Sequence, residues 1–247
     1  MAKKQRVDQL LVSRGLAKNR TKAQALILAG TVYNGQARLD KPGHQVAADI
    51  LIEVRERPHP WVSRGGIKLA YGLERFPINV KDNICVDVGS STGGFTDVLL
   101  QNGAEKVFAV DVGRGQLDWR LRNDERVIVL EGVNARHLDE IQVPEPPSII
   151  VCDTSFIGLR TVLPAVLKLA APAASLLALI KPQFEVGKGR VGKGGVVRDP
   201  ELHQEVCNTI RNWLSDEMGW RVTGVEQSPI KGPKGNVEFL ILASRGT

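Results

Sequence analysis

Residues 84–97 place an apolar strand, a glycine-rich turn and a helix in direct succession. Ile84 to Val88 is an apolar strand interrupted by one acidic residue, Asp87, small residues follow from Gly89 to Gly94, and a helical pattern begins at Phe95. A strand that ends in glycines and reopens as a helix is typical of the first βα turn of a doubly wound sheet. Glycine lets the backbone approach a ligand closely, and a helix N-terminus offers free N–H groups. The stretch therefore predicts an α/β fold with a ligand site at this turn.

The spacing of the glycines disfavours a dinucleotide as that ligand. The fingerprint G-x-G-x-x-G requires glycine where this chain has Ser91. Asp87, inside the strand end, would repel a diphosphate and suits a ligand with an ammonium group. Asp111, which ends the next apolar run, is placed to accept the two hydroxyls of a nucleoside ribose. S-Adenosylmethionine carries both groups, so we predict it as the cofactor; loop chemistry without any ligand is the alternative. The residues expected around it are Asp87, Gly89, Ser90, Ser91, Thr92, Gly93, Gly94, Phe95, Thr96, Asp111, Val112, Asn134 and Asp153.

Composition favours a polyanion as partner. The chain has 247 residues, 33 Lys and Arg against 27 Asp and Glu, and a formal net charge of +6. A merely basic protein is the alternative. The three cysteines lie far apart, which suggests core thiols in a reducing compartment and neither disulfides nor a metal site.

We expect a cytoplasmic protein without a membrane partner. No apolar stretch follows the basic start, so no signal peptide is expected. The longest apolar run, residues 169–180, is interrupted by Pro172 and is too short to cross a bilayer. A monomer or a weak homo-oligomer is expected.

Residues 1–60 read as a small α+β domain. Apolar spacing predicts one helix that ends at Gly15, and a second that begins at Asn19 or Thr21 and ends at Gly30. Asn34-Gly35 is a hairpin signal, and alternation over residues 50–54 predicts a closing strand.

This segment resembles the small RNA-binding domain first described in ribosomal protein S-four. The resemblance rests on Arg-Val-Asp-Gln-Leu-Leu-Val-Ser-Arg-Gly-Leu, Asn-Arg-Thr-Lys-Ala and Ala-Gly-Thr-Val-Tyr-Asn-Gly within residues 5–55. Basic side chains on the helix pair are expected to contact phosphates, and a solvated charged face is the alternative. With cations from the linker and from a later loop, the residues expected at RNA are Arg6, Arg14, Lys18, Arg20, Lys22, Arg64, Lys188, Arg190, Lys193 and Arg198.

A linker over residues 61–66 leads into a larger domain over residues 67–247. Apolar runs alternate with helical patterns there, which predicts a mostly parallel sheet covered on both faces. The short connection 227–236 permits a hairpin between the last two strands, so we expect one edge strand to be antiparallel. Helices are expected at 67–75, 159–170 and 200–218, and strands at 84–88, 106–110, 127–130, 148–152, 175–180, 220–226 and 237–243.

Four charged residues fall near ends of elements that would meet at one rim of the sheet. Asp153 follows the fourth strand and Lys181 follows the fifth, where open α/β sheets bind their ligands. Lys68 lies early in a helix. Glu238 begins an apolar strand, where a carboxylate is costly unless it is paired. Taken singly, each is more often a surface charge or a strand terminator.

The chain as a whole resembles the TlyA (hemolysin A) family. Members join the S-four-type domain to an FtsJ/RrmJ-like ribose methyltransferase domain with a Rossmann-like, seven-stranded sheet. One departure is His59-Pro60-Trp61, which leaves the coupling of the two domains less defined. The motifs that carry the resemblance are Val62-Ser-Arg-Gly-Gly-Ile-Lys68, Asp87-Val-Gly-Ser-Ser-Thr-Gly-Gly-Phe-Thr96, Val110-Asp-Val-Gly, Cys152-Asp-Thr-Ser-Phe-Ile, Ile180-Lys-Pro-Gln-Phe-Glu, Gly194-Gly-Val-Val-Arg-Asp and Gly235-Asn-Val-Glu238.

The resemblance implies 2′-O-methylation of ribosomal RNA, at cytidine, by a catalytic set of Lys68, Asp153, Lys181 and Glu238. A ribose hydroxyl is a poor nucleophile, so the protein must position it and take its proton. Lys181 is the candidate base, because the rim motifs contain no histidine. The glycine-rich basic stretch 184–198 is expected to become ordered on RNA; a disordered connector is the alternative.

Three other functions stay open from the sequence. The family label suggests a pore-forming hemolysin, and the absence of a spanning segment argues against it. A dehydrogenase is disfavoured by Ser91. An RNA-binding, hemolysin-like protein without methyltransferase activity is the remaining alternative.

Overall fold

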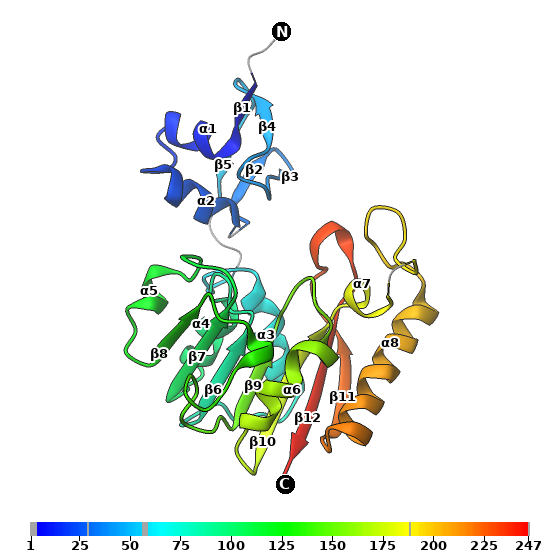
Figure 1. Ribbon diagram of the computed structural model, residues 1–247. Coiled ribbons are helices and arrows are strands. Elements are labelled where there is room, and N and C mark those ends of the chain that lie inside the picture. The colour runs from blue at the N-terminus through cyan, green and yellow to red at the C-terminus, as the bar shows by residue number, and fades with distance from the viewer. Residues whose placement is uncertain (1–3, 29, 56–58, 188, 247) are drawn as a thin grey trace. The chain divides into compact units, whose positions relative to one another are not determined.

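The computed structural model describes residues 4–28, 30–55, 59–187 and 189–246, which fall into two compact units (Figure 1). The first unit is Met1–Arg64 and the second is Gly65–Thr247. Each has its own hydrophobic core, and each is described by itself below.

The first unit is a helix pair packed on two small sheets. Val7, Leu10 and Ile27 are buried in its core. A two-stranded sheet pairs β1 with β4, and a three-stranded sheet has the order β3-β2-β5. The elements are β1 (Lys4–Arg6), α1 (Val7–Ser13), α2 (Arg20–Leu28), β2 (Val32–Asn34), β3 (Ala37–Arg38), β4 (Gln45–Ala47) and β5 (Glu53–Val54).

Local signals in the sequence account for the ends of these helices. Gly15, just beyond α1, has a φ of 70°, a conformation that glycine adopts without strain. Asn19 caps α2, because its Oδ1 accepts a hydrogen bond from the N–H of Lys22 at 2.8 Å. The hairpin between β2 and β3 pairs Asn34 with Ala37. The expected closing strand is confirmed only over Glu53–Val54, and the three-residue strands β1 and β4 were not predicted.

The second unit is a seven-stranded sheet with the strand order β11-β12-β10-β9-β6-β7-β8 (Figure 1). This confirms the predicted α/β fold. Its strands are β6 (Ile84–Val88), β7 (Lys106–Asp111), β8 (Val127–Glu131), β9 (Ile149–Cys152), β10 (Ala174–Ile180), β11 (Arg221–Gln227) and β12 (Phe239–Arg245). Its α-helices are α3 (Gly65–Arg75), α4 (Gly94–Gln101), α5 (Trp119–Arg122), α6 (Leu159–Leu169), α7 (Pro182–Glu185) and α8 (Pro200–Asn212), and a π-helix, Trp213–Glu217, continues α8.

The reversed strand is not the edge strand, and here the expectation was wrong. β12 is antiparallel to both of its neighbours, β10 and β11. The edge strand β11 therefore runs in the same direction as the five parallel strands. The hairpin through residues 228–238 was predicted correctly, but its second strand inserts between β11 and β10 instead of lying outside them.

Helices cover both faces of the sheet. Val86, Ile150 and Leu176 pack in one cluster with α6 and α8 on one face. Side chains at the alternate positions point to the opposite face. There α3 approaches β10 so closely that a Cβ on Gly72 would lie 2.7 Å from Cδ2 of Leu177. The arrangement is a three-layer sandwich whose parallel strands end at a common rim.

Candidate active site

The turn between β6 and α4 needs its glycines because neighbouring chain segments lie against it. Gly89 has a φ of 84°, and a Cβ there would lie 3.0 Å from both the carbonyl oxygen of Asp153 and Cγ2 of Thr154. At Gly93, with a φ of 92°, a Cβ would lie 2.2 Å from Cδ1 of Leu121. A larger residue would clash with the chain after β9 at Gly89 and with the side chain of Leu121 in α5 at Gly93, and both positions have the positive φ that glycine adopts without strain.

Asp87, near the end of β6, holds the start of α4 through hydrogen bonds from Thr96. It is fully buried, and its Oδ2 accepts hydrogen bonds from the N–H and the hydroxyl of Thr96 at 2.9 and 2.6 Å. Its Oδ1 has no hydrogen-bond partner among the described residues. Burial raises the pKa of Asp87 to about 7, against the opposing effect of the two bonds from Thr96. Direct contact between this carboxylate and an ammonium group stays a prediction.

Asp111 joins two loops at the carboxyl end of β7. Its Oδ2 accepts from the N–H of Ser91 at 2.8 Å, and its Oδ1 accepts from the N–H of Gly113 at 2.7 Å. Each oxygen keeps a further acceptor position. The carboxylate is thus held rigidly and still has capacity for a ligand's hydroxyl groups.

A cavity of about 340 Å³ opens beside Asp111, and it is lined entirely by residues of the second unit. Its size falls in the range of small-molecule sites. Of the residues expected at a cofactor, those on its wall are Gly89, Ser91, Asp111, Val112, Asn134 and Asp153. The others do not line the cavity: Asp87 lies in β6, and the turn and α4 hold the rest, namely Ser90, Thr92, Gly93, Gly94, Phe95 and Thr96.

Much of the wall was not anticipated from the sequence. Its apolar part includes Val110, Val133 and Ile157, which would suit the faces of an aromatic ring. Phe156, also on the wall, has a φ of 68° and is 91% exposed, and its ring is tilted against that of Phe184 with 5.3 Å between centroids. Val110 lies near the end of β7 and the others on the wall lie in loops whose approach to one another is set by the fold, so no local pattern assigned them to the cofactor site.

The four charged rim residues meet at the edge of this cavity. Asp153 lies between two ammonium groups: its Oδ2 is 3.2 Å from Nζ of Lys68, and its Oδ1 is 2.5 Å from Nζ of Lys181. Lys68 also donates to Oε2 of Glu238 at 2.7 Å. Two positive and two negative charges thus form one chain, which satisfies groups that would be costly to bury alone.

The reversed strand explains why Glu238 reaches this rim. β12 runs against its neighbours, so its start lies where the parallel strands end, and Phe239 pairs with Ile180 in the register. Glu238 and Lys181 are the residues next to that pair. Lys68 arrives from α3, one helical turn before Gly72, so the close packing of α3 on β10 sets its position.

Electrostatics keep the two partners Lys68 and Asp153 ionised. Burial by itself would lower the pKa of Lys68, but the charges of Asp153 and Glu238 outweigh burial and raise it. Burial would likewise raise the pKa of Asp153, but the two lysines outweigh it and hold that pKa below its ordinary value. Lys181 faces one carboxylate, that of Asp153, and donates to the hydroxyl of Ser155 at 3.1 Å.

The basic stretch after Lys181 is attached to the loop before β12 by Asn236. This amide is 3% exposed. Its Oδ1 accepts from the N–H of Val197 at 3.1 Å, and its Nδ2 donates to the carbonyl oxygen of Gly195 at 3.0 Å. Of the cations expected at RNA here, Arg190 forms a double ion pair with Glu205. Lys193 and Arg198 are exposed, and Lys188 lies outside the described residues.

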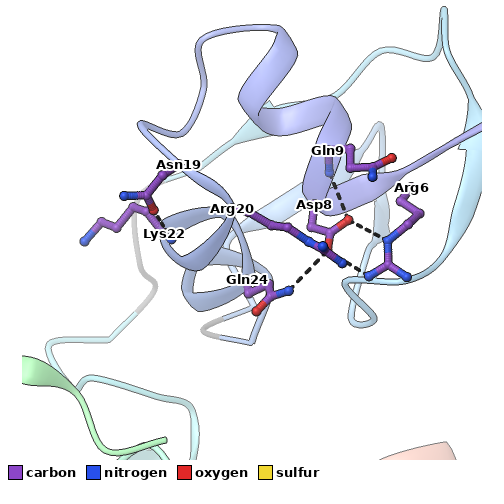
Figure 2. A network of polar contacts seen from close by, with 7 residues as sticks. All are labelled: Arg6, Asp8, Gln9, Asn19, Arg20, Lys22 and Gln24. Carbon is purple, nitrogen blue, oxygen red and sulfur yellow. Dashed lines mark hydrogen bonds and ion pairs between the residues drawn. The ribbon is translucent and has the colours of Figure 1, made fainter. Parts of the chain in front are cut away.

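Three of the six arginines and lysines expected at RNA in the first unit make internal contacts, and Figure 2 shows those of Arg6 and Arg20. Arg6 and Arg20 both bind the carboxylate of Asp8. Arg14 donates to the carbonyl oxygens of Ile50 and Ala48, at 2.6 Å each. Lys18 and Lys22 are exposed, and Arg64 is half-buried.

The second unit has the architecture of the S-adenosylmethionine-dependent methyltransferases. A seven-stranded sheet with one reversed strand, a glycine turn after its central strand and an acidic residue ending the next strand are the features of that class. Polar and charged side chains gather at the carboxyl rim of the parallel strands, where the class binds its ligands.

Comparison with known proteins identifies the family. The model of the FtsJ-like methyltransferase family matches residues 61–245, and that of the S4 domain matches residues 5–49. The chain therefore belongs to the FtsJ-like methyltransferase family and carries an S4 domain at its N-terminal end.

Relatives confirm the resemblance to the TlyA and hemolysin A proteins. The chain is 49% identical to the 16S/23S rRNA (cytidine-2′-O)-methyltransferase TlyA of Mycobacterium tuberculosis, over 98% of this chain and 90% of that one. It is 42% identical to Hemolysin A of Brachyspira hyodysenteriae, over 95% and 98%. A solved structure from Streptococcus thermophilus, described as a candidate hemolysin, is 40% identical with a TM-score of 0.77, over 99% of this chain and 90% of that one. Among the described residues, no helix is long and apolar enough to cross a membrane.

Proposed function

We propose that this protein is an S-adenosylmethionine-dependent ribose 2′-O-methyltransferase that acts on ribosomal RNA, at cytidine. The observation that carries the proposal is the ion-pair chain Glu238–Lys68–Asp153–Lys181 beside the cavity, because it joins a proton acceptor to groups that can hold a ribose. The reaction and nucleotide are those in the name of the Mycobacterium tuberculosis relative.

The residues present fit the cofactor. The rigid carboxylate of Asp111 would accept hydrogen bonds from the ribose, and the valines and Ile157 of the cavity would enclose the adenine. Gly89 admits the ligand close to the backbone, and the unpartnered Oδ1 of Asp87 supports a carboxylate role toward the amino group. When bound, the cofactor supplies a methyl group on a sulfonium.

The chain's own residues would position the acceptor and remove its proton. Lys68 contacts two carboxylates and stays protonated, so it would hold the ribose oxygen as a hydrogen-bond donor. Lys181, with one carboxylate and the hydroxyl of Ser155 as partners, would be the group that, as the neutral amine, accepts the proton of the 2′-hydroxyl. Asp153 would fix the separation of the two ammonium groups, and Glu238 would fix Lys68.

We further propose the division of labour between residues 1–60, which bind RNA, and residues 67–247, which carry out the transfer, with 61–66 as the connection. The match of the S4 domain and the excess of cations support this role for the first part. A hemolysin-like RNA-binding protein without methyltransferase activity is not favoured, because it would not account for the cavity or for the four charged residues Lys68, Asp153, Lys181 and Glu238 beside it.

Mapping of ribose methylation in cells tests the proposal. A 2′-O-methyl group prevents the ribose from attacking its own phosphodiester, so a methylated position resists alkaline hydrolysis. Ribosomal RNA from cells that lack this protein is expected to lose resistance at one or more cytidines, and a plasmid copy should restore it. Unchanged hydrolysis patterns at every cytidine would refute the assignment.

A further inference from the structure

The first unit buries one carboxylate, that of Asp8, in the first turn of α1. It is fully buried, and five donated hydrogen bonds converge on it (Figure 2). The N–H of Gln9 donates to Oδ1 at 2.9 Å, and Nε2 of Gln24 donates to Oδ2 at 3.2 Å. The other donors belong to the guanidinium groups of Arg6 and Arg20. This acid therefore ties β1 and α1 to α2.

The two arginines are held by one edge only. Arg6 donates through Nε at 3.0 Å to Oδ1 and through Nη2 at 2.8 Å to Oδ2. Arg20 donates to Oδ2 through Nε alone, at 2.9 Å. Within the residues that the structure describes, Nη1 of Arg6 and both Nη groups of Arg20 have no hydrogen-bond acceptor. The side chains are 33% and 56% exposed, so these remaining donors face solvent.

The cluster keeps a surplus of positive charge. Two guanidinium groups share one carboxylate, and the exposed Lys22 lies two residues beyond Arg20 in α2. Hydrogen bonding from Arg6 holds the pKa of Asp8 far below its usual range, so the clamp is complete at neutral pH. A guanidinium carries five donors in a rigid fork, and fixing one edge aligns the other edge for a planar acceptor.

We propose that Asp8 is a positioning residue for RNA binding: it fixes Arg6 and Arg20 so that their outward edges grip phosphate oxygens of the RNA backbone. The inference rests on the proposed function, since it takes RNA as the partner, and it assigns to an acidic residue a part in binding a polyanion. An arginine whose rotamer is already fixed loses less conformational freedom on contact with a phosphate. Asp8 acts through the arginines and does not touch the RNA.

The inference is testable because net charge and positioning predict opposite effects on RNA affinity when Asp8 is replaced. Asp8→Asn raises the net charge by one, which by Coulomb attraction alone would tighten binding to a polyanion. If Asp8 positions the arginines, the same substitution weakens binding in spite of the added charge. Asp49→Asn provides the matched control, because Asp49 is exposed in the same unit and makes no side-chain hydrogen bond within the described residues.

The full-length protein would be titrated into a fluorescein-labelled RNA stem-loop between about 50 and 200 mM KCl. Asp8→Asn is expected to bind about tenfold more weakly, with the slope of log K against log salt reduced by about 1 for each lost phosphate contact. Asp49→Asn should bind as tightly as the wild type or more tightly, with an unchanged slope. An Asp8→Asn protein that is folded and binds like Asp49→Asn would overturn the inference.

A second variant decides the question if Asp8→Asn unfolds the first unit. Arg20→Lys keeps the charge and the ion pair to Asp8 but removes the outward edge of the fork, at a side chain exposed enough to tolerate the change. Weaker binding with a reduced salt slope is expected, and wild-type affinity would overturn the inference. A wild-type protein that shows no salt-dependent RNA binding would remove the proposed function and this inference together, whereas the outcomes above remove the inference alone.

Discussion

At the scale of single residues, Asp153 is the centre of the candidate site. Each of its oxygens faces a different lysine, so it holds two ammonium groups at the mouth of the cavity. A lone carboxylate at a strand end would be an ordinary terminator. Its two cationic partners, and the second carboxylate on Lys68, make it part of a set that is neutral overall and so tolerates burial.

Substitution of Asp111 tests the cofactor site. Asp111→Ala is expected to weaken S-adenosylmethionine binding by roughly 1.5–3 kcal/mol, which is the cost of losing a charged hydrogen bond. The substitution also removes the acceptor that holds the N–H groups of Ser91 and Gly113. Isothermal titration calorimetry measures this directly. Asp124→Ala is the control, since Asp124 pairs with Arg126 and does not line the cavity. Equal affinity for the two variants would take Asp111 out of the site.

Asp87 makes the stability of the ligand-free protein depend on pH. Burial raises its pKa to about 7 in the folded state, so the folded state binds a proton more tightly than the unfolded chain does. The associated stability is present at acid pH and is lost as the pH rises through about 7, by at most about 1.4 kcal/mol per pH unit. The unfolding temperature of the wild type should therefore fall relative to that of Asp87→Asn between about pH 5 and pH 8. Parallel curves for the two proteins would contradict a raised pKa.

The sequence predicted the four charged residues of the candidate active site, but it could not predict which arginines have partners within the protein. Lys68, Asp153, Lys181 and Glu238 fall at element ends, and a sheet brings such ends together, so their meeting was predictable. Whether a surface arginine is free for RNA depends on its partners. Arg14 donates hydrogen bonds to two backbone carbonyl groups of its own unit that lie more than thirty residues away in the sequence. No local pattern reveals such a contact.

At the scale of elements, the long strands were predictable and the short ones were not. Strands such as Ile149–Cys152 are apolar throughout, as expected where both faces of a sheet are covered. β1 and β4 have three residues each, too few to show a period of two. The length of the loop before β12 predicted that β11 and β12 form a hairpin. It did not predict which of the two pairs with β10, because that depends on how all the strands of the sheet pair.

The junction held by Asn236 gives a prediction at this scale. Asn236→Ala would leave the N–H of Val197 and the carbonyl of Gly195 without their partner, at a cost of about 1–3 kcal/mol in unfolding free energy. The loop before Glu238 would loosen at the same time, so methyl transfer should fall more than cofactor affinity does. Asn208→Ala, on the exposed side of α8, should change stability by about 0.5 kcal/mol or less.

Chemical denaturation and single-turnover kinetics on these two variants measure both effects. If Asn236→Ala unfolds and reacts like Asn208→Ala, the basic stretch and the loop before β12 are not coupled through this amide.

At the scale of the whole molecule, the two units have separate hydrophobic cores, and the proposed function gives them separate tasks. The cavity is lined only by residues between 88 and 162, so it does not require the first unit. Deletion of residues 1–60 is expected to leave S-adenosylmethionine affinity near that of the full chain and to reduce RNA affinity and its salt dependence. A truncated protein that folds and binds RNA with full affinity and the same salt slope would assign RNA recognition to the second unit alone.

The central claim, that the methyl group goes to a ribose oxygen with Lys181 as base, is tested most directly by one measurement. Ribosomal subunits would be incubated with the protein and methyl-deuterated cofactor under single-turnover conditions, and the RNA digested to nucleosides for mass spectrometry. The wild type should place the label on the ribose of cytidine. Lys181→Ala should do so at least about a hundredfold more slowly, with cofactor affinity unchanged, and Lys181→Arg should be nearly as slow, since a guanidinium stays protonated. Label on a base, or an arginine variant at nearly the wild-type rate, would contradict the account.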